Sequence, residues 1–162
     1  MRLSIYVHSI RNNAFYGNIY VRYNKAAILD ADSAKVELTS TSPPLELTKV
    51  HKTELEFANG FTSLERAMDS NELLQLLSER AVQLEVVHKD RSAGGLVKGT
   101  ATVRLSALKS VKFVKADDSY VRVHDCYYAI HCADDGDELG ELRVKLFLED
   151  FGPADASLQR ER

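Results

Sequence analysis

The chain has 162 residues, of which 44% are hydrophobic and 28% are charged, and its formal net charge at pH 7 is −3. This length and composition predict one domain that buries an apolar core and folds alone. The small net charge gives no support for a nucleic-acid partner, because such proteins usually carry a clearly basic face.

The N-terminus shows no continuous hydrophobic run, and no segment approaches the ~20 apolar residues that cross a bilayer. The two cysteines, Cys126 and Cys132, are predicted to be free thiols in a reducing compartment. The sequence therefore predicts a protein of the cytoplasm.

Two segments near the N-terminus alternate apolar and polar residues. Leu3, Ile5 and Val7 share one face of a strand predicted over 2–8, and the apolar residues from Phe15 to Tyr23 share another. Together they predict the opening hairpin of a β-sandwich. Weaker patterns predict short strands at 36–38 and 55–57.

Helical capping patterns occur twice in the middle of the chain. Thr62 with Glu65, and Asp69 with Glu72, each place a capping side chain three residues before a glutamate. A leucine stripe follows the second pair, at positions 73, 74, 76 and 77. We therefore expect a short helical insertion in this part of the chain.

The rest of the chain returns to alternation with a period of two, at 82–86, 101–105 and 142–148. Residues 120–131 are longer than an ordinary strand, which predicts a bend near Asp125, and the acidic run 134–138 predicts an exposed hairpin turn. About eight strands with one helical insertion indicate an all-β, antiparallel sandwich. The predicted domain covers 1–152, followed by a flexible polar tail over 153–162.

The segment VQLEVVHKDRSAGGLVKGTATVRL at 82–105 and the closing segment GELRVKLFLEDFG at 140–152 resemble the back half of a C2 domain, with the closing segment as an edge strand. Calcium-binding C2 domains need several converging carboxylates in the intervening loop, because Ca²⁺ takes six to eight oxygen ligands. This loop offers Asp90 alone, between Lys89 and Arg91, and the opposing loop at 10–17 has no carboxylate. The sequence predicts a calcium-independent domain without a cofactor.

Other chemistries find little support in the sequence. His124, Cys126, His131 and Cys132 are residue types that bind zinc, but the first two share a strand face and the last two point oppositely. There is no nucleophile elbow and no glycine-rich phosphate loop. We therefore expect a protein that is not an enzyme.

Charge is unevenly distributed along the chain. Residues 89–115 contain seven cations and one acid, whereas 134–150 contain seven acids and two cations. A basic surface that contacts an acidic partner is one interpretation, and neutralisation between adjacent basic and acidic strands is the other. The first interpretation predicts a partner-binding patch made of Lys89, Arg91, Lys98, Lys109, Lys112 and Lys115.

Three motifs carry a narrower resemblance: LEVVHKD at 84–90, VKGTATVRLSAL at 97–108 and ELRVKLFLEDFG at 141–152. They resemble a C2 domain of the large centrosomal proteins that promote centriole elongation. The resemblance implies a protein-interaction module of the centrosome, centriole or basal body, with centriolar proteins, tubulin or microtubules as partners. The alternative is a calcium-independent peripheral membrane C2 domain that binds anionic lipid, for which Leu96 and Val97 offer an apolar loop tip.

Overall fold

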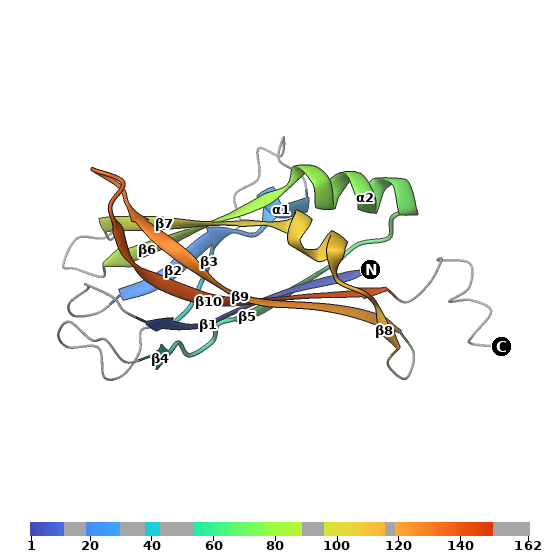
Figure 1. The fold of residues 1–162 in the computed structure, drawn as a ribbon, viewed down its shortest axis with the longest axis horizontal. Helices are drawn as coiled ribbons and strands as arrows, with labels where there is room; N and C mark the ends of the chain where they lie inside the picture. The colour runs from blue at the N-terminus through green and yellow to red at the C-terminus, as the bar shows by residue number, and fades with distance from the viewer. Residues whose placement is uncertain (12–18, 30–37, 43–53, 89–95, 116–118, 151–162) are drawn as a thin grey trace.

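The computed structural model describes residues 1–11, 19–29, 38–42, 54–88, 96–115 and 119–150, and it is dominated by antiparallel strands (Figure 1). The elements in chain order are β1 (Arg2–Arg11), β2 (Ile19–Asn24), α1 (Ala26–Leu29), β3 (Leu38–Ser40), β4 (Leu55–Glu56), β5 (Phe61–Glu65), α2 (Ser70–Glu79), β6 (Ala81–His88), β7 (Leu96–Arg104), the 3₁₀ helix η1 (Leu105–Ser110), β8 (Val114–Lys115), β9 (Tyr120–Cys132) and β10 (Glu138–Asp150).

The strands form one curled sheet in the order β3-β2-β6-β7-β9-β10-β1-β4, with β5 added to β1 and β8 added to β9. β7 and β9 join only through the pairs Gly99 with Cys132 and Thr100 with His131. Because the joint is so short, the strands before and after it fold over each other as the two layers of a sandwich (Figure 1). The predicted all-β antiparallel sandwich is confirmed.

Alternation in the sequence accounts for the core between the two layers. Along β10, every second residue is buried, and Leu142, Val144, Leu146 and Leu148 are all fully inaccessible. The same period operates in β6 and β7, where the buried residues include Leu84, Ala101 and Val103. One continuous cluster of buried side chains therefore spans both layers.

The second capping pattern begins the helix α2, and its cap is the predicted one. The Asp69 carboxylate accepts a hydrogen bond from the Glu72 amide at 2.8 Å. Leu76 and Leu77 are buried, whereas Leu74 is 56% exposed. The first capping pattern was wrong: Thr62 and Glu65 lie in β5, which pairs with β1 from Phe61 to Glu65.

Three predictions about strand arrangement were wrong. β1 and β2 do not form a hairpin, since β1 pairs with β10, β4 and β5, while β2 pairs with β3 and β6. β10 is not an edge strand, because β9 and β1 flank it on both sides. Residues 120–132 form one unbroken strand, with continuous pairing to β10 past Asp125. Long-range pairing decides each of these features, and alternation alone does not encode it.

Some sequence predictions fall on residues outside the described part of the chain. These are Phe15, positions 36 and 37 of the strand predicted at 36–38, the tail at 153–162, and the loop residues Lys89, Asp90 and Arg91.

Candidate binding surfaces

The strand ends that precede and follow the two predicted C2 loops lie together. Ile19 pairs with His88, and His88 also pairs with Leu96, so these three residues, which flank 12–18 and 89–95 in sequence, lie together at one end of the sandwich. The exposed turn between β9 and β10 is at the same end, where the Ala133 amide donates to the Lys98 carbonyl at 3.2 Å. In sequence, these two loops together hold a single carboxylate, Asp90.

Metal-binding clusters are absent from the part of the chain that the structure describes, since no three His, Cys, Asp or Glu side chains are close enough to share an ion. Within the same residues, no helix is long and apolar enough to cross a membrane. His124 and Cys126 lie on one side of β9, as predicted.

The described lysines of the predicted patch occupy two ends of the molecule. Lys98 is exposed beside the β9–β10 turn, whereas Lys115 pairs with Tyr120 at the other end of β9. A 13-residue strand separates these positions by about 40 Å. Lys109 and Lys112 lie with Lys115, and Lys109 donates to the Ser78 hydroxyl at 3.0 Å. The described lysines therefore do not form one continuous patch.

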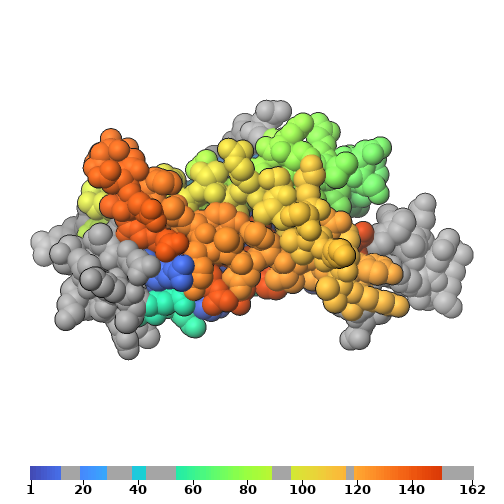
Figure 2. Space-filling model, viewed as in Figure 1, coloured from blue at the N-terminus to red at the C-terminus, as the bar shows by residue number. Residues whose placement is uncertain are grey.

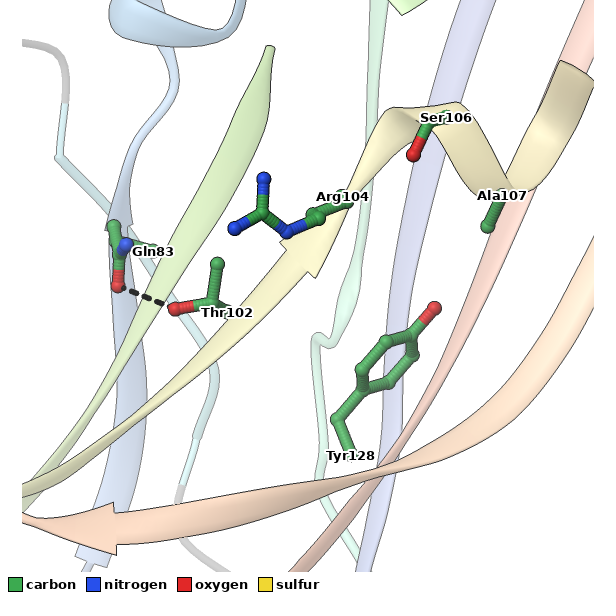
Figure 3. A pocket seen from close by; sticks show the side chains of 6 residues that line it. All are labelled: Gln83, Thr102, Arg104, Ser106, Ala107 and Tyr128. Atoms are coloured by element: carbon green, nitrogen blue, oxygen red, sulfur yellow. Dashed lines mark hydrogen bonds between the residues drawn. The ribbon is translucent and has the colours of Figure 1, made fainter. Parts of the chain in front are cut away.

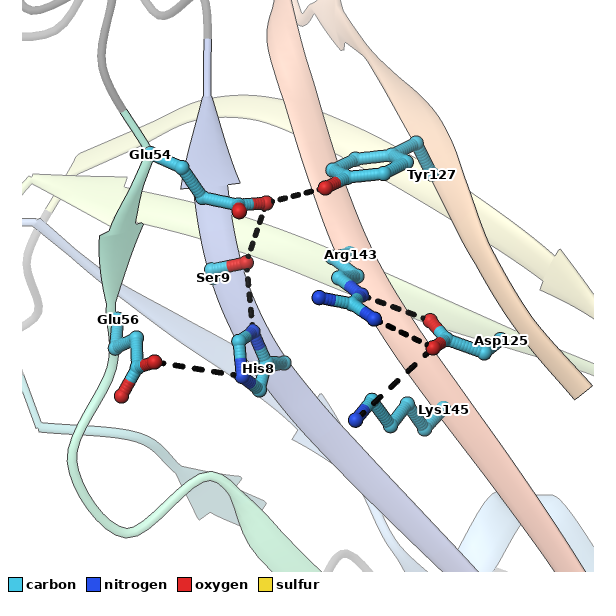
Figure 4. Close-up of polar contacts among 8 residues, drawn as sticks. All are labelled: His8, Ser9, Glu54, Glu56, Asp125, Tyr127, Arg143 and Lys145. Carbon is cyan, nitrogen blue, oxygen red and sulfur yellow. Dashed lines mark hydrogen bonds and ion pairs between the residues drawn. The ribbon is translucent and has the colours of Figure 1, made fainter. Parts of the chain in front are cut away.

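The outer face of β9, β10, β1 and β4 carries a chain of polar contacts (Figure 4). The Tyr127 hydroxyl donates to Glu54 Oε1 at 2.6 Å, and the Ser9 hydroxyl donates to the same atom at 2.9 Å. The Tyr127 hydrogen bond is the main reason that the pKa of Glu54 lies below its usual value. These contacts hold Glu54, the residue immediately before β4, against β1 and β9.

An arginine pairs with an aspartate on the same face. Arg143 donates to both carboxylate oxygens of Asp125, at 2.9 and 2.7 Å, and Lys145 lies 4.0 Å from Asp125. The Arg143 hydrogen bonds hold the pKa of Asp125 below its usual value. Cations and acids on this face therefore neutralise one another within the pair β9 and β10.

His8, Ser9 and Glu56 have the residue types of a hydrolytic triad, but their geometry is structural. The Ser9 residue is fully buried, and its hydroxyl proton is directed to Glu54. The His8 Nε2 lies 3.5 Å from Glu56. A buried serine that donates to a carboxylate cannot attack a substrate, so these residues join β4 to β1.

Aromatic side chains cross the outer face beside these polar contacts. The Tyr6 and Phe61 rings lie 6.2 Å apart, the Phe61 and Phe147 rings lie 6.5 Å apart, and Phe147 is paired across the strands with Val123. Phe61 is 57% exposed and Val123 is 44% exposed. We call Tyr6, Phe61, Phe147 and Val123 the aromatic stripe.

A surface hollow of about 480 Å³ lies where β7 and β9 diverge beneath η1 (Figure 3). Its lining residues are Gln83, Thr102, Arg104, Ser106, Ala107 and Tyr128. The Thr102 hydroxyl donates to Gln83 Oε1 at 3.0 Å, and the Tyr128 hydroxyl lies 2.9 Å from His124 Nε2. None of the lining residues is a carboxylate, and no described residue forms an ion pair with Arg104.

Two tyrosines give the protein a predicted response to alkaline pH. Burial raises the pKa of Tyr23 to about 12, and burial likewise raises the pKa of Tyr128 to about 12. The unfolded chain, with tyrosine pKa values near 10, then loses protons before the folded chain does. The contribution of these two tyrosines to the free energy of unfolding is therefore fully present below pH ~10 and falls as the pH rises toward 12. Urea unfolding at several alkaline pH values should show this decline, and absorbance at 295 nm should show a late-titrating fraction that Tyr23→Phe diminishes.

The hollow was not predicted from the sequence. In the sequence, Arg104 is one cation of the basic segment 89–115, and Tyr128 is one residue of the long segment 120–131. Alternation places Arg104 on the outer face of β7. The divergence of β7 from β9, however, depends on the two residue pairs that join these strands, and no local sequence pattern predicts those pairs.

Comparison with solved structures identifies the fold as that of C2 domains. A C2 domain of plant extended synaptotagmin 1 matches with a TM-score of 0.53 and 12% identity, over 92% of this chain and 95% of that one. A C2 domain-containing protein from a putative elicitor-responsive gene matches with a TM-score of 0.57 and 14% identity, over 95% and 92%. No family model and no curated protein sequence matches the chain.

Proposed function

We propose that this chain is a non-enzymatic, calcium-independent C2 module that binds a protein partner during centriole or basal-body assembly. The aromatic stripe is the observation that carries the protein-binding part of the proposal. Aromatic side chains and arginines are enriched in protein interfaces, and both occur on this face: Arg11 stacks on Tyr127, with its guanidinium carbon 3.2 Å from the ring centre.

Calcium independence is supported by the amino-acid composition of the two segments 12–18 and 89–95, which correspond in sequence to the predicted C2 loops. Asp90 supplies the single carboxylate, and its sequence neighbours Lys89 and Arg91 would repel a divalent cation. The centriolar setting is supported by the three motifs LEVVHKD, VKGTATVRLSAL and ELRVKLFLEDFG. Centriolar proteins, tubulin or microtubules are the partners that this resemblance implies.

A second candidate function is docking on anionic lipid. One observation favours it: Leu96, which follows the loop at 89–95, is 51% exposed, and Lys98 is exposed two residues later. An apolar tip beside cations is the pattern of a membrane-docking loop. Flotation with vesicles that contain phosphatidylinositol 4,5-bisphosphate tests this candidate, and strong binding that Leu96→Ser abolishes would support it.

The main proposal is tested by a crosslinked pull-down from dividing, ciliated cells, run once with CaCl₂ and once with EGTA. We expect the wild-type chain to recover centriolar proteins or tubulin equally in both buffers, and Phe61→Ser to lose most of that recovery. Leu38→Ser is the matched control, because Leu38 is 58% exposed on β3, in the other layer of the sandwich. Recovery that requires calcium, or that Leu38→Ser reduces as much as Phe61→Ser does, would contradict the proposal.

A further inference from the structure

The strand β9 has a long open edge. From Arg122 to Ala129, its one described neighbouring strand is β10, because β8 pairs only with Val121 and Tyr120, and β7 pairs only with His131 and Cys132. Figure 2 shows β9 in orange across the middle of the face toward the viewer, with the β9–β10 turn at one side and η1 and β8 at the other. The open edge spans roughly 25 Å.

An open edge of this kind presents backbone N–H and C=O groups that can pair with another chain. Partner proteins use such edges by adding an extended segment as a further strand, and pockets beside the edge then select particular side chains. Cys126, at the middle of this edge, is exposed, whereas η1 lies against one end of the edge, where the Arg122 guanidinium donates to the Leu108 carbonyl at 3.0 Å.

The hollow beneath η1 opens beside this edge and supplies the selective pocket. Arg104 lies in it without an ion-pair partner among the described residues, and Ser106, Tyr128 and the Gln83 amide add further hydrogen-bond donors (Figure 3). The Tyr128 hydroxyl lies 2.9 Å from His124 Nε2 and, like any tyrosine, is protonated at neutral pH. A guanidinium and neutral donors with no carboxylate suit an oxyanion.

We propose that the wedge between β7 and β9 binds an extended, acidic segment of a partner protein. The segment adds to the open edge of β9 and places a carboxylate or phosphate against Arg104. This inference rests on the proposed protein-binding function and specifies the chemistry of one partner.

Fluorescence anisotropy with labelled peptides of about eight residues tests whether binding requires an acidic side chain in the added segment. The probes have the sequence Thr-Val-Thr-Thr-X-Thr-Val-Thr, where X is glutamate, phosphoserine or glutamine. We expect the two acidic peptides to bind, the glutamine peptide to bind at least about tenfold more weakly, and Arg104→Gln to weaken the acidic peptides by roughly ten- to hundredfold.

Lys98→Gln is the matched control, since it removes one exposed positive charge at the Cys132 end of β9. Equal loss in Arg104→Gln and Lys98→Gln would mean a general charge effect and would overturn the inference. Binding that ignores the residue at X would overturn it as well. Arg104-dependent binding to vesicles with phosphatidylinositol 4,5-bisphosphate, without binding to the peptides, would mean that the hollow binds a lipid headgroup. This outcome would also overturn the inference.

Backbone N-methylation tests strand addition, because it removes the N–H groups that pair with an edge. Two versions of the glutamate peptide carry N-methyl groups at odd or at even positions. Alternate residues of an added strand face β9, so one version should lose binding and the other should keep it. Loss in both versions or in neither would exclude strand addition.

The pull-down separates this inference from the proposed function. If Phe61→Ser removes the centriolar partners while Arg104→Gln leaves both partners and peptides unaffected, the inference fails and the proposed function stands.

Discussion

Gly60→Ala is expected to lower the free energy of unfolding by about 3 kcal/mol. A Cβ at this position would lie 2.1 Å from the backbone oxygen of Val7 and 3.1 Å from its carbonyl carbon. The Gly60 carbonyl also accepts the Val7 amide at 2.9 Å, so this approach is part of the attachment of the β4–β5 connection to β1. Val7 is fully buried and pairs with Val144 of β10, which prevents β1 from moving aside.

Urea unfolding of Gly60→Ala measures this effect, and Asn59→Gly provides the matched control at the preceding position. Asn59 has a φ of 54°, a conformation that glycine adopts more readily than asparagine, and its side chain makes one exposed hydrogen bond to Ser42. We expect the control to change stability by less than about 1 kcal/mol. A similarly small change in Gly60→Ala would show that the β4–β5 connection is not held tightly against β1.

The parts of the fold that the sequence predicted are those set by local alternation and capping. Leu3, Ile5 and Val7 are buried as their spacing indicated, and the Asp69 cap makes the hydrogen bond that its pattern requires. Both signals act within a few residues, where the chain geometry fixes which side chains share a face. They report what an element is, but not which element lies beside it.

The failed predictions concern choices between distant partners. Thr62 and Glu65 match a helical cap, yet pairing along the whole of β5 with β1 places both residues in a strand instead. The alternating pattern of β10 is equally compatible with an edge strand or an interior one, because both bury one face. Tertiary pairing overrides the local preference in the first case and decides an open choice in the second.

The candidate binding surfaces likewise include features that the sequence composition shows directly and features that depend on which strands pair. The scarcity of loop carboxylates is a property of composition and could be counted directly. The hollow at Arg104 and the aromatic stripe depend on which strands become neighbours: Tyr6 and Phe61 are 55 positions apart in sequence and meet only because β1 pairs with β5. The described lysines were close in sequence, but β9 separates them by its full length.

Leu146→Ala is expected to lower the free energy of unfolding by about 2–5 kcal/mol. Leu146 is fully buried at the centre of β10, between Ile5 on β1 and His124 on β9. Truncation removes its apolar contacts and leaves a cavity that the neighbouring strands cannot close without losing their register. Leu74→Ala is the matched control, because Leu74 is 56% exposed on α2 and alanine favours the helix, so its cost should stay below about 0.5 kcal/mol.

The way in which Leu146→Ala unfolds distinguishes one shared core from two separately stable layers. The buried cluster includes residues of β6 and β7 as well as those of β10, so damage in one layer should destabilise the other equally. Urea transitions followed by tyrosine fluorescence and by far-ultraviolet circular dichroism should therefore shift together and coincide. Two separated transitions would mean that the short joint at Gly99 and Thr100 leaves the layers energetically independent.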